Sequence, residues 1–312
     1  MPGSSIPSPA SSIPSPASPP GITILPVHKI QSGQLIETTD PVAVEQPLEI
    51  RLQYGPSAAR IEQNISLTMR TPGHDTELAL GFLFSEGILP GPTPIIRTRS
   101  DPDSILICLH ESFFPDLSRT QRSSYTNSSC GVCGKLSIDA LRRPQPAAAG
   151  HPSPSQTAQS FPHTAAGHPS PTAQSFPPIS ADLLFQLPQR LRASQDIFDS
   201  TGGLHAAALF DHSGQIIVLR EDIGRHNALD KLIGYCFLRN SLPETNSILI
   251  LSGRACFELI QKAATAGITI IAAVGPPSSL AVQAAEESGI TLVGFLRDRR
   301  CNIYSGAHRI RS

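Results

Sequence analysis

The chain of 312 residues carries 24 Lys and Arg against 25 Asp and Glu, which gives a formal net charge of −1. This balance provides no general attraction to nucleic acid or to an anionic membrane, so neither is predicted as a partner. Aromatic residues make up only 5% of the chain and Trp is absent, so aliphatic side chains must form the cores of the two modest domains that the length predicts.

The cysteine content and the hydropathy pattern predict a compartment. Six cysteines in a chain of this length are too sparse for the disulfide framework of a small secreted domain. The sequence opens without a basic segment followed by an apolar one, and no run approaches the ~18 apolar residues of a membrane span. We therefore expect a protein of the reducing cytoplasm.

The first 125 residues divide into a tail and a folded unit. Residues 1–20 are rich in Ser, Pro and Ala, with IPSPAS written twice, and predict a disordered tail. Residues 21–125 predict a smaller N-terminal α+β domain, because alternating apolar residues indicate strands and a turn with capping residues indicates a helix. The expected elements are strands at 48–52, 65–69 and 104–109 and a helix from Asp75 or Thr76 to Gly87.

A pair of thiols marks the loop at residues 126–136, where SSCGVCGK places Cys130 and Cys133 three positions apart. A thiolate is a nucleophile and a metal ligand. A zinc site usually needs a second CxxC or a His pair, and a thioredoxin-type site needs a strand before the pair and a helix after it. The chain has no second CxxC, and polar loop residues precede Cys130, which argues against both. A sulfur-handling thiol that carries a persulfide is the third interpretation, and two loop cysteines without chemistry are the plain one.

The rest of the chain contains an insertion and a second domain. In residues 144–179, AAGHPSP and TAQSFP each occur twice among many prolines, which predicts a disordered Pro-rich insertion. Residues 180–312 alternate apolar runs with helical patterns and predict a layered α/β domain. The expected strands are 205–210, 216–219, 248–251, 268–274 and 291–295, and the expected helices are 183–199 with an interruption at Pro188, 228–237, 257–267 and 278–289.

Polar residues of this second domain gather at junctions between strands and helices, which lie on one edge of a sheet where ligands bind. Gly and Ser at helix starts present free backbone N–H groups, and the arginine fork matches phosphate oxygens. Each residue alone has a plain structural explanation, so the repetition across junctions predicts a site for a large phosphate-bearing ligand. The residues are Gly202, Gly203, His205, Arg225, His226, Asn227, Gly253, Arg254, Ser278, Ser279, Arg297, Arg299 and Arg300.

Several long motifs carry a family resemblance. They are SSCGVCGK, TGGLHAAALF, REDIGRHNALDKLIG, SGRACFELIQKAATAGI, GITLVGFLRDRRCNIY and the upstream RTPGHDTELALGFLFSEGIL. In this order they resemble the formate dehydrogenase accessory sulfurtransferases, the sulfur carrier protein FdhD family. The resemblance runs from about residue 22 to residue 304 and excludes the Pro-rich insertion.

The resemblance implies a function. Members carry sulfur from a cysteine desulfurase to the molybdenum cofactor, bis-molybdopterin guanine dinucleotide, before formate dehydrogenase receives it. Cys130 would hold the persulfide, and Cys133 would assist or resolve it. The ligand-contact segment of the family matches Phe295, Leu296, Arg297, Asp298, Arg299 and Arg300. A homodimer is common in the family.

The resemblance also implies that the second domain shares the cytidine deaminase fold. The deaminase signature H-x-E…P-C-x-x-C is absent, so no metal ligated by the protein itself is predicted. The chain departs from the family at Cys256, where Ser is usual, and at Gly275-Pro276, where Ser-Ala is usual. Cys256 and Cys301 are interpreted as inert cysteines. A cofactor-binding chaperone without sulfur chemistry and a zinc-dependent nucleotide deaminase are the alternatives.

Overall fold

The computed structural model describes residues 21–117, 178–242 and 247–312. The predicted tail at 1–20, the loop at 126–136 with Cys130 and Cys133, and residues 144–177 of the insertion lie outside the described residues. Predictions that concern those segments therefore stay predictions.

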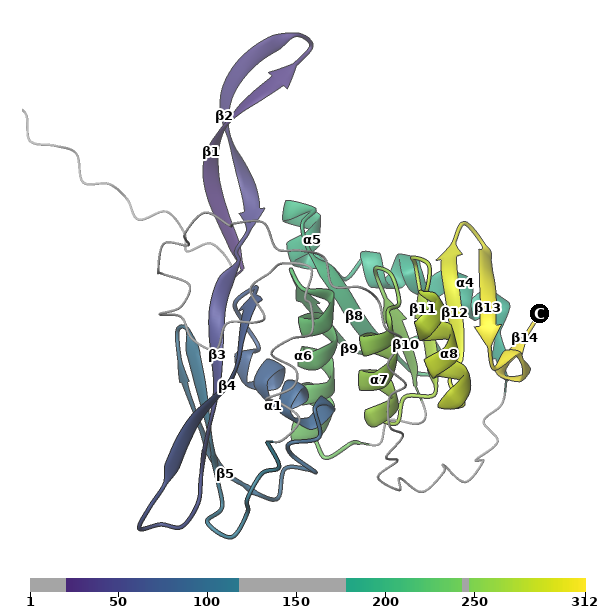
Figure 1. The fold of residues 1–312 in the computed structure, drawn as a ribbon. Helices are drawn as coiled ribbons and strands as arrows, with labels where there is room; N and C mark the ends of the chain where they lie inside the picture. Colours follow the sequence, from purple (N-terminus) through teal and green to yellow (C-terminus); the bar gives the residue numbers. More distant parts are fainter. Residues whose placement is uncertain (1–20, 118–177, 243–246) are drawn as a thin grey trace, which may run out of the picture.

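A six-stranded sheet forms the centre of the second part of the chain, with strand order β13-β12-β11-β10-β8-β9 (Figure 1). The strands are β8 (His205–Phe210), β9 (Ile216–Asp222), β10 (Ile248–Leu251), β11 (Ile270–Ala273), β12 (Thr291–Arg297) and β13 (Arg300–Ser305). The three central strands β10, β11 and β12 run parallel, whereas β8, β9 and β13 each pair antiparallel with their neighbours. The parallel strands are continuous apolar runs because helices cover both of their faces.

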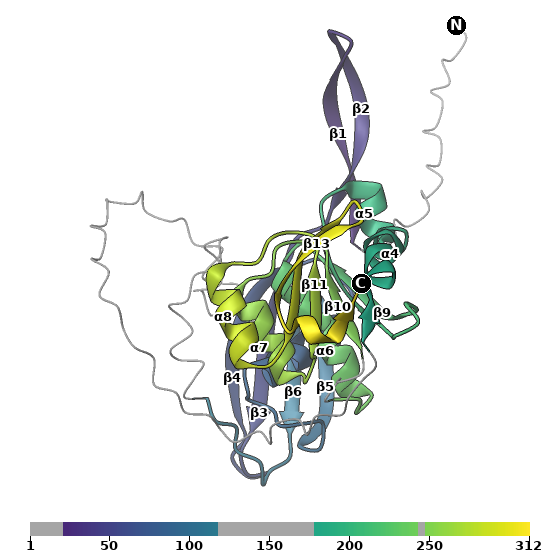
Figure 2. The same ribbon diagram turned by 90° about the vertical axis from the view of Figure 1, so that its right-hand side faces the viewer.

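Helices lie on both faces of this sheet, as Figure 2 shows. One face packs on α4 (Ala181–Arg192), and the other packs on α6 (Arg225–Leu238), α7 (Phe257–Thr265) and α8 (Ser279–Glu287). Alternate residues of β8 serve the two layers: Ala208 and Phe210 join the α4 cluster, and Ala207 and Leu209 join the α6 cluster. The predicted α/β class is confirmed, and the likeness to the cytidine deaminase fold stays a prediction.

The first part of the chain builds a second sheet, of strand order β4-β3-β6-β5, with one helix packed on it. Its elements are β3 (Gln46–Tyr54), β4 (Ile61–Arg70), α1 (Asp75–Ser85), β5 (Ile95–Asp101) and β6 (Ser104–Leu109). The apolar residues that predicted strands in 48–52 and 104–109 form its core with Leu78, Leu80 and Leu83 of α1. These elements agree with the strands and the helix expected there.

A long hairpin was not predicted. Strands β1 (Ile22–Gln31) and β2 (Gln34–Ala43) pair antiparallel and project away from the rest of the molecule in both views (Figures 1 and 2). Ser32 and Gly33 form the turn, with φ of 52° and 80°, the pairing of positive values that two-residue hairpins favour. Ile30 and Leu35 near the tip are 75% and 68% exposed. This part of the hairpin therefore has no buried face, and a buried face is what makes apolar and polar residues alternate along a strand.

The helix expected over residues 183–199 is two helices. Pro188 lies inside α4 without breaking it, and the chain instead breaks after Arg192 and resumes as α5 (Asp196–Thr201). The carboxylate of Glu221 accepts hydrogen bonds from the backbone N–H groups of Ile197 and Phe198, at 3.1 and 2.9 Å. A residue distant in sequence thus caps α5 and fixes where it begins.

Small elements complete the fold. The last residues pair with the start of the second domain through the parallel strands β7 (Ile179–Ser180) and β14 (Ile310–Arg311), after the 3-10 helix η1 (Ala307–Arg309). Within the described ranges, no helix is long and apolar enough to cross a membrane.

The two parts of the chain meet where α1 crosses α6. A Cβ atom placed on Gly81 of α1 would lie 1.8 Å from the carbonyl oxygen of Asp230, and one on Gly234 of α6 would lie 1.8 Å from that of Glu77. The two glycines therefore face opposite backbones with no side chain between them. Beside the crossing, the rings of Phe84 and Phe237 pack edge to face at 5.7 Å.

Replacing either crossing glycine by alanine should push the helices apart. We expect Gly81→Ala and Gly234→Ala each to lower the free energy of unfolding by at least about 1–3 kcal/mol, the usual cost of overpacking, because backbone lies opposite and has no rotamer to change. Urea denaturation followed by circular dichroism measures this. Gly91→Ala is the control, since a Cβ there meets nothing within 4 Å. Equal stability of all three variants would show that the crossing tolerates a methyl group.

Candidate functional site

Several loops meet at one edge of the six-stranded sheet because of the strand directions. The parallel strands β10, β11 and β12 all end there, and β8 runs the opposite way and begins there. Strand β9 is antiparallel to β8 and therefore also ends there. We call this edge the loop edge. It comprises residues 202–205, 223–227, 252–256, 274–279 and 295–300.

Backbone hydrogen bonds tie neighbouring loops of this edge together. The N–H of Gly275 donates to the carbonyl of Gly253, and the N–H of Phe295 donates to the carbonyl of Gly275, at 3.0 and 3.1 Å. A Cβ on Gly253 would come within 3.1 Å of Nδ1 of His205, and a Cβ on Gly275 would come within 3.0 Å of the backbone of Gly253. The loop edge is therefore a packed backbone surface whose glycines permit close approach.

The last loop contains a local distortion. The register of β12 and β13 shifts between Gly294 and Arg297, and Phe295 within the shift has a φ of 54°. An aromatic residue in the left-handed region is strained by about 1–3 kcal/mol, and such bulges are common beside functional sites. Asp298 and Arg299 then form a two-residue turn with φ of 52° and 54°.

The structure separates the residues that were expected to contact a ligand in this segment. Leu296 is fully buried in the cluster under α4, so its side chain belongs to the core. Arg299 reaches α4 instead, where its guanidinium lies 2.7 Å from the carboxylate of Asp182 and 5.6 Å from the ring of Phe185. Arg297, Asp298 and Arg300 are exposed at the turn.

Unpaired arginines give the loop edge an excess of positive charge. Within the part of the chain that the structure describes, no carboxylate forms an ion pair with Arg225, Arg254, Arg297 or Arg300. Arg225 is the first residue of α6, and its Nε is buried without a hydrogen-bond partner among the described residues. A buried guanidinium donor left unpaired at a helix start is suited to bind an anion.

His205 begins β8 beside these arginines and is half-buried. Burial and, secondly, the positive charges of Arg225 and Arg254 hold the pKa of His205 below its usual value of 6.5. The imidazole is therefore neutral at pH 7, and its Nδ1 faces the open side of Gly253. A neutral imidazole can both donate and accept a hydrogen bond at the loop edge.

His226 contacts two side chains at the start of α7. Its Nε2 lies 3.2 Å from Sγ of Cys256 and 2.8 Å from a carboxylate oxygen of Glu258. Burial and the charges of Arg225, Lys262 and His205 lower the pKa of His226 to about 4. Cys256 is partly exposed, unlike the buried cysteine expected from the sequence. Glu258 was not predicted, because a carboxylate in the first turn of a helix is the usual partner of the helix dipole.

Asn227 was predicted to contact the ligand but turns toward the first part of the chain. Its amide nitrogen donates to the carbonyl of Met69 at 2.8 Å and to Asp222 at 3.1 Å, and its oxygen accepts from Thr68 at 3.1 Å. Both polar atoms of its amide thus bond to other groups of this chain. Asn227 therefore positions the start of α6 against β4.

The remaining predicted residues lie on exposed backbone. Gly202 ends α5 with a φ of 65°, and Gly203 follows it beside the end of β2. Ser278 caps α8, since its hydroxyl accepts a hydrogen bond from the N–H of Ala281, and Ser279 is the first residue of that helix. All four residues are exposed on loops of the same edge.

A buried ion pair anchors this edge to the first part of the chain. Nζ of Lys231 lies 2.7 Å from the carboxylate of Asp222 and donates to the carbonyl oxygens of Thr71 and Glu221, at 2.8 and 3.2 Å. The Asp222 carboxylate also accepts from the N–H groups of Thr71 and Gly224. Burial raises the pKa of Asp222, and the charge of Lys231 opposes that rise.

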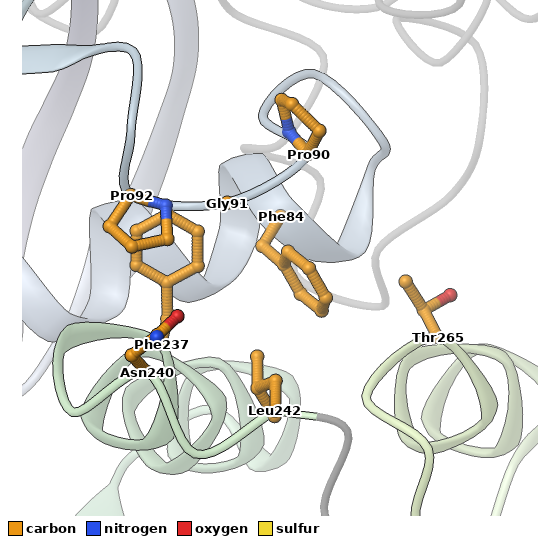
Figure 3. A pocket seen from close by; sticks show the side chains of 8 residues that line it. All are labelled: Phe84, Pro90, Gly91, Pro92, Phe237, Asn240, Leu242 and Thr265. Carbon is orange, nitrogen blue, oxygen red and sulfur yellow. The ribbon is translucent and has the colours of Figure 1, made fainter.

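A cavity of about 270 Å³ lies at the other end of α6, and Figure 3 shows the side chains around it. It is lined by Phe84, Pro90, Gly91, Pro92, Phe237, Asn240, Leu242 and Thr265. Helix α6 begins at the loop edge with Arg225 and ends near this cavity with Leu238. The cavity is therefore separate from the loop edge and shares none of its residues.

Comparison with known sequences gives consistent matches. A sequence model described as the FdhD/NarQ family matches residues 43–175 and 152–311. A protein named "Sulfur carrier protein FdhD" from Streptomyces avermitilis is 43% identical over 305 residues, which cover 91% of this chain and 94% of its own length. A protein of the same name from Streptomyces coelicolor is 42% identical over 304 residues with the same coverage.

Comparison with solved structures finds a similar fold. A crystal structure from Desulfotalea psychrophila, described as a formate dehydrogenase accessory protein, superposes with a TM-score of 0.63. It covers 94% of this chain and 100% of its own, at 22% identity. At that level of identity the likeness bears on the fold alone.

Removing the cation from the anchoring pair should leave a buried, unpaired carboxylate. We expect Lys231→Met to lower the free energy of unfolding by about 3–5 kcal/mol near neutral pH. Without Lys231 the pKa of Asp222 rises further. Asp222 is then neutral in the fold at low pH, and the deficit grows as pH rises from the unfolded value of 3.8 through the raised pKa.

Urea midpoints at about pH 5 and about pH 8 measure this, because linkage makes the deficit larger at the higher pH. Lys29→Met, at an exposed lysine on β1, is the control. A deficit that is independent of pH would mean that Asp222 stays charged in the fold even without its partner, so that its pKa is not raised into this range.

Proposed function

The chain belongs to the FdhD/NarQ family, and we propose on that premise that it is a sulfur carrier that activates the molybdenum cofactor of a formate dehydrogenase. Its relatives at 43% and 42% identity are named sulfur carrier proteins and align with 91% of the chain. The observation that carries the cofactor part of the proposal is the set of arginines at the loop edge that no described carboxylate neutralises. The chain acts in the cytoplasm, where a cysteine desulfurase and the apo-dehydrogenase are its partners.

The sulfur step is assigned to the two thiols of the CxxC loop. The Cys130 thiolate attacks the terminal sulfur of a persulfide on the desulfurase, whose thiolate leaves, and Cys130 then holds the new persulfide. Delivery of that sulfur as sulfide requires two electrons. The Cys133 thiolate supplies them by attacking the Cys130 sulfur, which expels sulfide and closes a disulfide that a cellular dithiol later reduces. This makes Cys130 the acceptor and Cys133 the resolving thiol.

The loop edge is assigned to the cofactor, bis-molybdopterin guanine dinucleotide, which is the bound substrate of the transfer. The cofactor carries phosphates at several points, and separate arginines from separate loops suit such a spread of charge better than one compact phosphate loop. Buried Nε of Arg225, without a partner among the described residues, supports an anion at the start of α6. Gly253 packs against the ring of His205 and Gly275 packs against the backbone of Gly253, so the separate loops form one surface.

Replacing the acceptor thiol should stop sulfur transfer without harming the fold. We expect Cys130→Ser to gain no sulfur after incubation with desulfurase and cysteine, and to leave formate dehydrogenase inactive in cells that lack the native protein. Intact-protein mass spectrometry and dehydrogenase activity measure the two effects. Cys301→Ser, at a partly exposed cysteine outside the loop, is the control. Cys133→Ser should take up sulfur but deliver it poorly.

Normal activation by Cys130→Ser would remove that thiol from the mechanism. Normal activation by a variant that lacks both Cys130 and Cys133 would instead identify the protein as a cofactor-binding chaperone.

Replacing arginines of the loop edge should weaken binding of the nucleotide part of the cofactor. With guanosine diphosphate as the probe, we expect Arg225→Gln and Arg254→Gln each to raise Kd by about tenfold, since a hydrogen bond to a charged group contributes about 1.5–3 kcal/mol. Isothermal titration calorimetry measures Kd. Arg97→Gln, at an exposed arginine of β5 in the other sheet, should leave Kd unchanged. Equal Kd values in all three variants would place the nucleotide elsewhere.

A further inference from the structure

The N-terminal ends of α6 and α7 place three ligand-type side chains together. His226 is the second residue of α6, Cys256 is the N-cap of α7, and Glu258 is the second residue of α7. Their ligand atoms all lie within 4.8 Å of one another. The sequence predicted His226 as a ligand contact and Cys256 as an inert cysteine, and the two residues are 30 positions apart.

We propose that His226, Cys256 and Glu258 bind one divalent zinc ion and leave one coordination position open. Bond lengths of about 2.0–2.3 Å to a tetrahedral zinc ion place its ligand atoms roughly 3.3–3.6 Å apart. Here Nε2 of His226 lies 3.2 Å from Sγ of Cys256 and 2.8 Å from Oε2 of Glu258, and Sγ lies 3.9 Å from that oxygen. Shifts of about half an ångström would therefore give zinc geometry.

The donor set selects zinc among the common divalent ions. A thiolate excludes magnesium and calcium, which prefer oxygen ligands, whereas zinc accepts sulfur, imidazole nitrogen and carboxylate oxygen together. The charges also balance, because one thiolate and one carboxylate neutralise the two positive charges of the ion. Three protein ligands with an open fourth position are the pattern of reactive zinc sites.

The backbone that carries these ligands is fixed independently of any ion. Ala255 forms a parallel bridge with Pro277, and its N–H and carbonyl bond to Pro276 and Ser278 at 3.2 and 3.0 Å, so the chain that leads into Cys256 is held on both sides. On the other helix, Asn227 follows His226 directly and donates to the carbonyl of Met69 in β4, which holds the start of α6 in place. Ligands on anchored helix starts stay close enough to bind without a large rearrangement.

An ion can reach the site from solvent. The side chain of His226 is 28% exposed and that of Glu258 is 50% exposed. The neighbouring cation Lys262 is already neutralised, since its Nζ lies 2.9 Å from Asp230 and 3.4 Å from Glu86. Arg225 has no ion-pair partner among the described residues. Its single positive charge is smaller than the two negative charges that Cys256 and Glu258 supply as zinc ligands.

The zinc site goes beyond the proposed function, because none of its ligands takes part in the sulfur transfer assigned to Cys130 and Cys133. His226 also belongs to the loop edge. A bound ion would withdraw its Nε2 from direct contact with the cofactor and would offer the open coordination position to a water molecule or an anionic ligand at the same edge. The simpler role is a hydrogen bond between neutral His226 and the Glu258 carboxylate, at 2.8 Å, and the experiment must separate this role from zinc binding.

The experiment measures zinc binding to the full chain in which Cys130 and Cys133 are both replaced by Ser, so that the CxxC thiols cannot bind the metal. Under reducing conditions we expect one equivalent of zinc by competition with a chromophoric chelator. Cobalt in its place should give the near-ultraviolet charge-transfer band of a thiolate ligand. In this background Cys256→Ser should abolish the band and weaken zinc binding by at least about tenfold, the loss that even an outer-shell substitution causes. His226→Gln and Glu258→Gln should also weaken binding.

The matched control is Cys301→Ser in the same background, since Cys301 is likewise a partly exposed free cysteine. It should keep one equivalent of zinc and the cobalt band. Glu258→Gln changes a half-exposed side chain, so it tests the site even where another variant unfolds, and circular dichroism checks the fold of each. Absence of stoichiometric zinc from the background protein, or zinc binding that survives both Cys256→Ser and His226→Gln, overturns the proposal. Neither result bears on sulfur uptake by Cys130.

Discussion

The crossing of α1 and α6 fixes the relation between the two parts of the chain. Gly81 and Gly234 each face a backbone carbonyl of the other helix so closely that no side chain fits between them. Polar contacts also join the two parts: Arg220 donates to the carboxylate of Glu77 at 2.5 and 2.8 Å, and the buried Lys231 donates to the carbonyl of Thr71 at 2.8 Å. Separating the two parts would break the Glu77–Arg220 pair and the hydrogen bonds of Lys231 and Asp222 to the backbone of Thr71.

This constraint reaches the loop edge because α6 begins there. Asn227, two residues into the helix, bonds to Met69, and Lys231, one turn further, bonds to Thr71. The first part of the chain therefore sets the position and direction of Arg225 and His226 without contributing to the edge itself. The six-stranded sheet carries the loop edge, and the first part of the chain holds that edge in place. The smaller part therefore has a role in the site.

Elements were predicted correctly where burial on one or both faces produces a hydrophobic pattern in the sequence. Residues 48–52 alternate and 248–251 are continuously apolar because one has one buried face and the other has two. The β1–β2 hairpin was missed because its apolar residues, such as Ile30 and Leu35, are exposed. Its strands therefore lack the alternation of apolar and polar residues that a buried face produces. The break between α4 and α5 was misplaced because the carboxylate that caps α5 belongs to Glu221, which lies in strand β9. Contacts between distant segments leave no local signal.

The same distinction explains the site. Strand direction alone brings the predicted loops to one edge, so topology could be read from the order of strands and helices. The direction in which a side chain points could not, because at Leu296 it depends on the register shift that begins at Gly294 and on the positive φ of Phe295. The group of His226, Cys256 and Glu258 is the extreme case, since it needs two helices to begin side by side. Residue type is local information, whereas the convergence of ligands is a property of the packed fold.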